Sequence, residues 1–118
     1  ELERMFEVVY ESQRAGVEAV TAGVTAGHVD EVCRNWINLA GMAELFVHST
    51  GHGVGLDVHE EPWVAQGVDT ELRPGMVVTV EPGVYRGGVG GVRIEDTLVV
   101  TEGGCRSLTK APRELIRV

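Results

Sequence analysis

Basic side chains, cysteine and long apolar runs are all scarce in this sequence of 118 residues. Lysine and arginine together number 10 against 18 acidic residues, which gives a formal net charge of −8. Because nucleic-acid backbones and anionic lipid surfaces attract cationic faces, this balance argues against nucleic acid and against membranes as partners. No apolar run approaches the roughly 20 residues of a membrane span, and residues 1–4 do not resemble the start of a signal peptide.

Only two cysteines are present, Cys33 and Cys105, and they are far apart in the sequence. Two isolated cysteines without a secretion signal are typical of reduced thiols, so we expect a cytoplasmic protein. The sequence begins with glutamate rather than methionine, and its first residues already follow a helical pattern. We therefore expect a single unit of about one domain's length that is part of a longer protein.

Residues 1–43 predict two helices, because apolar residues recur there at intervals of three and four. The pattern of the first helix breaks at residues 21–23, and Thr25 is a suitable N-cap for the second helix. Gly41 is a natural end for that second helix. We expect the apolar stripes of both helices, including Trp36, to pack in the core.

Beyond residue 44 the pattern changes to short apolar and β-branched runs separated by glycine and proline. Residues 87–91 form a glycine-rich loop, and the mixed tail from Leu108 to Val118 allows a strand at the edge of a sheet. Helices that precede the strands along the chain indicate the α+β class rather than a wound parallel sheet. The predicted extended segments are Leu45–Val47, Met76–Val80, Val84–Tyr85, Val92–Ile94 and Thr97–Val100.

Three of the four histidines lie close together in residues 48–60. His48 and His52 are four positions apart, and the glycines around His52 make a helix unlikely there. In an extended chain the same spacing also places both imidazoles on one face. His59 is an odd number of positions from His52, so it points away unless a glycine bend or a bulge brings it back.

Two glutamates occupy positions where strands begin or end. Glu81 ends an apolar strand, and Glu95 follows it by fourteen positions, beyond the glycine-rich loop. If the two strands pair around that loop, the carboxylates meet, and one of them must take a proton, find an arginine or share a metal. Arg93 could supply an ordinary salt bridge to Glu95. Together with His52, however, the pair makes a one-histidine, two-carboxylate set that suits manganese, iron, cobalt or zinc, and the joint occurrence favours a metal site.

The order of these motifs resembles the pita-bread metallopeptidases, most closely the proline-peptidase branch of Xaa-Pro dipeptidase (prolidase) and aminopeptidase P. The resemblance rests on His48–Pro62, Leu72–Tyr85 and Gly91–Thr97, and Leu108–Leu115 resembles the usual end of that domain. It implies a partial pita-bread fold, with an antiparallel-rich curved sheet and two long helices on one face. Residues 1–118 then correspond to the C-terminal part of a catalytic domain.

The resemblance also implies a metal centre and a reaction. His52, Glu81 and Glu95 match metal ligands of that family, and Glu81 also matches the group proposed there as the general base. The family's paired metals, commonly manganese or cobalt, generate hydroxide from water and polarise the scissile carbonyl. The implied reaction is hydrolysis of the peptide bond preceding proline in a short peptide.

Four further residues match positions around the family's metals. His59 matches a catalytic histidine that stabilises the intermediate or moves a proton, in contact with the substrate. His48 matches a histidine that borders the substrate pocket. Arg93 and Tyr85 match positions beside the site, with Arg93 also expected to contact the substrate.

The sequence departs from the family pattern in its ligand set. The family uses five protein ligands, two of them aspartates that come before the first long helix, and none of Asp30, Asp57, Asp69 and Asp96 lies in a matching context. We therefore expect residues 1–118 alone to hold at most one ion weakly and to have little or no activity. The alternative is an inactive half-domain that binds a peptide or a protein, or that forms a homodimer through an exposed sheet edge.

Overall fold

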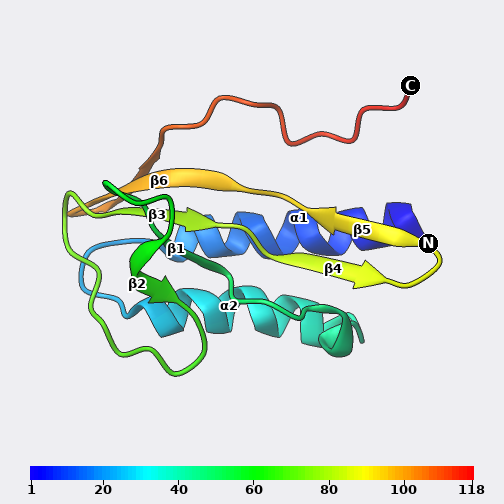
Figure 1. Cartoon of the computed structure of the whole chain (residues 1–118), viewed down its shortest axis with the longest axis horizontal. Helices are drawn as coiled ribbons and strands as arrows, with labels where there is room; N and C mark the ends of the chain where they lie inside the picture. The colour runs from blue at the N-terminus through cyan, green and yellow to red at the C-terminus, as the bar shows by residue number, and fades with distance from the viewer.

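Two helices and then seven short strands follow one another along the chain, and the structure, a computed structural model, describes all of residues 1–118. The helices are α1 (Leu2–Ala19) and α2 (Ala26–Leu39), followed by a short 3-10 helix, η1 (Ala43–Leu45). In Figure 1 the strands lie in front of α1, and α2 runs beside α1. The α+β class is confirmed. The strands are β1 (Gly51–Gly53), β2 (Glu60–Val64), β3 (Val77–Val80), β4 (Gly83–Arg86), β5 (Gly90–Arg93), β6 (Asp96–Thr101) and β7 (Gly104–Ser107).

The strands form two antiparallel sheets. A five-stranded sheet has the order β2-β1-β3-β6-β7, and β4 pairs with β5 in a two-stranded sheet. The pairing of β3 with β6, predicted as a condition for the two glutamates to meet, places Val80 opposite Asp96. The glycine-rich loop is the turn of the β4–β5 hairpin, in which Gly88 adopts a φ of +77° that favours glycine.

Both helices begin and end close to the predicted positions. The Thr25 hydroxyl caps α2 by accepting a hydrogen bond from the backbone N–H of His28 at 3.0 Å, and Gly41 follows the helix with a φ of +77°. The prediction for Trp36 was wrong, because its side chain is 42% exposed. The buried stripe of α2 runs through Val29 and Cys33 instead, and Trp36 lies at its side. Neither helix is long and apolar enough to cross a membrane.

Other predicted segments differ from the structure. In the predicted extended segment Leu45–Val47, Leu45 instead ends the 3-10 helix η1. Phe46 does have extended backbone angles, but no strand forms there. The tail beyond Ser107 forms no strand. The edge of the sheet on that side is β7, which precedes the tail. Strands β1 and β2 were not predicted, because glycine and proline are unusual inside strands.

The core contains two clusters, one between the helices and the central sheet and one near the start of α1. The helices cross closely at Gly16, where a Cβ atom would overlap the Cys33 sulfur. This close approach lets both helices cover the same face of the sheet. The opposite face is left free to carry polar side chains.

Candidate metal centre

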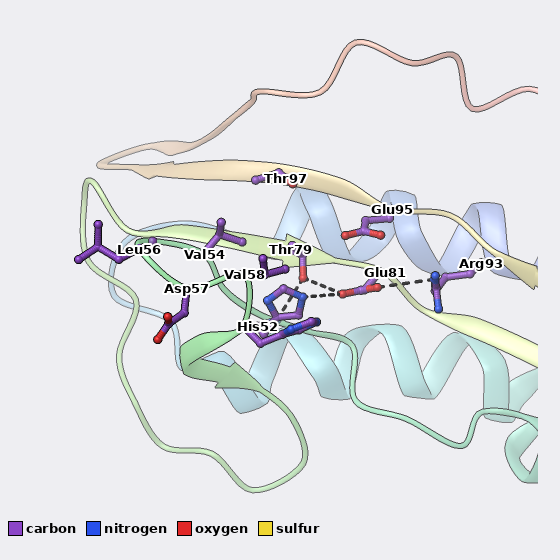
Figure 2. A pocket seen from close by; sticks show the side chains of 12 residues that line it. His52, Val54, Leu56, Asp57, Val58, Thr79, Glu81, Arg93, Glu95 and Thr97 are labelled. Carbon is purple, nitrogen blue, oxygen red and sulfur yellow. Dashed lines mark hydrogen bonds and ion pairs between the residues drawn. The ribbon is translucent and has the colours of Figure 1, made fainter.

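Glu81 and Glu95 are brought together by the β3–β6 pairing. Glu81 directly follows Val80, and Glu95 directly precedes Asp96, so the two glutamates flank the last pair of the ladder. Figure 2 shows both carboxylates facing the same space as the ring of His52. One ligand atom from each of His52, Glu81 and Glu95 lies within 4.8 Å of the others. The spatial convergence expected from the sequence is therefore present.

His52 is held in a defined orientation by its own backbone and by a neighbour. Its Nδ1 lies 2.9 Å from the carbonyl oxygen of Gly53, which can only accept a hydrogen bond, so Nδ1 carries a proton. Nε2 is left facing Oε1 of Glu81 at 3.0 Å. Two lone pairs would repel at that distance, so the position between these atoms suits a proton or a bound cation. With a metal there, Nε2 would be the ligand atom while Nδ1 keeps its proton.

Thr79 links His52 to the Glu81 carboxylate, although it was not among the predicted site residues. Its hydroxyl accepts a hydrogen bond from the backbone N–H of His52 at 3.1 Å and donates one to Oε1 of Glu81 at 3.0 Å. Gly51 makes this possible, because a side chain there would overlap the Thr79 backbone. The available signal was a polar residue two positions before Glu81, on the same face of the strand.

The negative charges of Glu81 and Glu95 are not fully balanced by nearby positive charges. Burial raises the pKa of Glu95 above its ordinary value, and the nearby negative charge of Glu81 raises it further. Nε of Arg93 lies 3.6 Å from Oε2 of Glu81, so the arginine pairs with Glu81 rather than with Glu95. The unbalanced negative charge is what a divalent cation would neutralise.

His59 lies beside His52, although its position in the sequence would place it on the other face of a regular strand. The ring centroids of the two histidines are 4.3 Å apart. The pairing of β1 with β2 shifts register between His52 and Gly53. This irregularity is a bulge of the kind predicted to bring His59 back to the face of His52. His59 lines the same cavity as the ligand group.

His48 and Tyr85 form a neighbouring group rather than part of the cavity wall. Nε2 of His48 is 2.9 Å from the hydroxyl oxygen of Tyr85. The neighbouring Tyr85 hydroxyl is the main cause that raises the pKa of Arg93. His48 is therefore connected to the carboxylates through Tyr85 and Arg93, but it does not line the cavity.

The cavity in front of these groups has a volume of about 510 Å³, within the usual range for small-ligand sites. Its mouth is formed by the loop between β1 and β2, where Leu56 and Val58 are exposed (Figure 2). The residues that line it are His52, Val54, Gly55, Leu56, Asp57, Val58, His59, Thr79, Glu81, Arg93, Glu95 and Thr97.

The donor set fits a divalent metal. One imidazole nitrogen and several carboxylate oxygens suit manganese, cobalt, iron or zinc, and the three side chains leave coordination positions open. The buried aspartates are engaged elsewhere, since Asp30 pairs with Arg34 at 2.9 Å and Asp96 pairs with Arg113 at 2.7 Å. Neither contributes to the ligand group.

Comparisons with known proteins agree with this geometry. The family model of metallopeptidase family M24 matches residues 1–102. An Xaa-Pro dipeptidase from Pyrococcus horikoshii is 52% identical over 112 residues, which are 95% of this chain and 32% of the relative. The solved structure of an Xaa-Pro dipeptidase from Bacillus anthracis is 50% identical with a TM-score of 0.96, and the match covers 98% of this chain and 32% of that chain.

A further solved structure, an X-Pro aminopeptidase from Thermotoga maritima, is 42% identical with a TM-score of 0.93 over 96% of this chain and 32% of that chain. The chain thus spans about a third of the length of the curated relatives it matches. These likenesses confirm the partial pita-bread fold that the resemblance implied. The chain belongs to metallopeptidase family M24.

Proposed function

We propose that this chain provides part of the active site of a metallopeptidase that hydrolyses the peptide bond preceding proline. The observation that carries the proposal is the convergence of one imidazole and two carboxylates within 4.8 Å at the wall of a 510 Å³ cavity. Similarity to Xaa-Pro dipeptidases at 52% and 50% identity supports the substrate class. Activity is proposed for a protein that supplies the remaining ligands, with little or none from residues 1–118 alone.

Manganese or cobalt is the proposed metal, held by Nε2 of His52 and by the carboxylates of Glu81 and Glu95. When bound, such a metal lowers the pKa of water and polarises the scissile carbonyl. Three protein donors leave positions for water. We therefore propose that this chain alone holds one ion weakly, whereas the complete site holds two.

Glu81 is proposed to accept a proton from the attacking water in addition to binding metal. Its two oxygens are held from different sides, Oε1 by the Thr79 hydroxyl at 3.0 Å and Oε2 by Arg93 at 3.6 Å. A general base must lie within hydrogen-bond reach of the proton that it removes. The two contacts keep the carboxylate turned toward the cavity for this purpose.

His59 and Arg93 are proposed to contact the substrate, because both line the cavity. His59 would donate a proton or a hydrogen bond as charge develops on the reacting carbonyl or the leaving nitrogen. The bond before proline has no N–H, so recognition depends on shape and on the peptide's free amine and carboxylate. Arg93 is half-exposed and can face a carboxylate, while His48 supports it through Tyr85.

The test of the ligand set compares two histidines in the same chain. His52→Ala should weaken Mn²⁺ binding at least about tenfold, because one of three donors is lost. His28→Ala is the control, since His28 lies at the start of α2, away from the cavity. Calorimetric titration of the metal-free chain measures both affinities, and hydrolysis of Xaa-Pro dipeptides is followed in a longer protein that supplies the remaining ligands. Equal Mn²⁺ affinity in the two variants would refute His52 as a ligand.

A second candidate function is binding without turnover, with self-association through a sheet edge. The five-stranded sheet ends in β2 and β7, each paired on one side only. Trp63 on β2 is 43% exposed, and Trp36 and Leu39 expose apolar surface on α2. Unpaired edges and contiguous apolar surface favour association. We propose that this self-association produces a homodimer through one of these edge strands.

A cytoplasmic location remains a proposal. Cys33 and Cys105 are both unpaired, and each thiol hydrogen-bonds to a backbone carbonyl of α1. Two separate thiols engaged in this way fit a reducing compartment.

A further inference from the structure

A buried carboxylate lies on the helix side of the sheet, directly behind the candidate metal centre. Asp96 is 2% exposed, and it begins β6 immediately after Glu95. Because successive side chains of a strand point to opposite faces, Asp96 faces α1 while Glu95 faces the cavity. The Glu81 and Glu95 chemistry makes no direct use of Asp96, so its burial needs another explanation.

Three groups from two distant parts of the chain converge on Asp96. Gln13 of α1 donates a hydrogen bond from Nε2 to Oδ2 at 2.8 Å. The Thr109 hydroxyl donates to Oδ1, and Nε of Arg113 lies 2.7 Å from Oδ2. Burial of a carboxylate is costly unless it is paired and hydrogen-bonded, and here every partner is supplied.

The Asp96 group is positioned to act on Glu95. Glu81 is contacted by His52, Thr79 and Arg93, whereas Glu95 forms no ion pair. The location of the Glu95 carboxylate therefore depends on its backbone. That backbone is fixed at the next residue, where Asp96 is held by its partners and lies opposite Val80 in the ladder.

We propose that Asp96, together with Thr109 and Arg113, positions Glu95 for metal binding, so that the segment after β7 supports the metal centre from behind. The proposal rests on the proposed function in one respect, namely that Glu95 binds the metal. Asp96, Thr109 and Arg113 are positioning residues, since they touch neither the cavity nor the ligand atoms. Further ties hold the segment against β6, including a hydrogen bond from Leu108 N–H to the Thr97 carbonyl oxygen at 2.8 Å.

The test uses the full chain and two arginines of the same tail. Arg113→Ala removes the ion pair to Asp96, and Thr109→Val removes the hydroxyl with little change of shape. Arg117→Ala is the matched control, because Arg117 pairs with Glu3 at 2.6 Å on the surface, away from Asp96. Calorimetric titration with Mn²⁺ should show about tenfold weaker binding for the first two variants and unchanged binding for the control.

A double-mutant cycle separates positioning of Glu95 from a general loss of structure. In a Glu95→Gln background, Arg113→Ala should cause no further loss of Mn²⁺ affinity, because the ligand that it positions is gone. In a His52→Ala background, the loss should persist. Equal affinity of Arg113→Ala and Arg117→Ala, or an undiminished effect without Glu95, would overturn the proposal.

The outcome remains decisive if the unmodified chain binds no Mn²⁺. That result would refute the proposed metal binding by this chain alone, and amide hydrogen exchange in the metal-free chain would then test the positioning role by itself. Exchange at residues 95–97 should be faster in Arg113→Ala than in Arg117→Ala, with equal circular dichroism in both. Unchanged exchange at these residues would refute the anchoring role of Asp96 as well.

Discussion

Replacing Glu95 with glutamine should have opposite effects on the metal-free and the metal-loaded protein. Without metal, the Glu95 carboxylate is disfavoured by burial and by the charge of Glu81, which together raise its pKa. Glu95→Gln removes that charge and keeps the size of the side chain, so the metal-free fold should become more stable. With metal, the same substitution removes a ligand and should reduce the stabilisation that binding gives.

The magnitude follows from the geometry of the site. Ligand atoms of the two glutamates lie within 4.8 Å of each other, and two unit charges at that separation repel by about 1 kcal/mol in a water-like dielectric. We use this lower limit because Glu95 is only partly buried, so solvent screens its interactions. For a chain of this length, relief of about 1 kcal/mol raises Tm by about 4 °C.

The pH dependence has a definite sign. Because the pKa of Glu95 in the folded protein lies above the ordinary value of 4.5, the unfolded chain loses this proton first as the pH rises. Ionisation of Glu95 therefore destabilises the wild-type fold above its folded pKa. The extra stability of Glu95→Gln relative to the wild type should be complete above that folded pKa. It should vanish as the pH falls below 4.5, where Glu95 is protonated in both the folded and the unfolded protein.

Thermal unfolding with and without Mn²⁺ measures both effects. At free metal about 100 times the Kd, binding should stabilise the wild type by about 2.7 kcal/mol, and Glu95→Gln should lose most of this gain. Glu102→Gln is the control, because Glu102 is exposed and forms no ion pair. A lower metal-free Tm for Glu95→Gln at pH 7, or an undiminished metal-induced shift, would refute the charge argument.

Two other predictions concern the cavity wall and the sheet edge. Thr79→Val should weaken Mn²⁺ binding about tenfold by calorimetry, because the hydroxyl holds both a ligand imidazole and a ligand carboxylate. Thr97→Val, at the same cavity, should leave the affinity unchanged, and equal losses in the two variants would contradict the role of the hydroxyl. Sedimentation velocity should show a dimer fraction that grows with protein concentration, and a monomer at all concentrations would argue against association through the edge strands.

The meeting of Glu81 and Glu95 could be predicted because it depends on local information. A β-branched run, a glycine-rich loop and a second run form an antiparallel pair around the loop, and the spacing then fixes which residues end opposite each other. The helix boundaries at Thr25 and Gly41 were equally accessible, since capping and left-handed backbone depend on single residues. Predictions of this kind require no knowledge of tertiary contacts.

The features that escaped prediction depend on contacts between segments distant in the sequence. Thr79 has the sequence features of an ordinary strand residue, and its role depends on the hydrogen bond from His52 of β1, which only the folded structure provides. The side of α2 that is buried depends on where α1 crosses it, and this crossing leaves Trp36 outside. Gln13 and Asp96 are 83 positions apart and meet only when α1 covers the sheet. The ligands of the candidate centre are thus visible as local motifs, whereas the contacts that orient them arise only from the packed fold. Substitutions at Thr79 or Asp96 should therefore impair metal binding while every ligand motif remains intact.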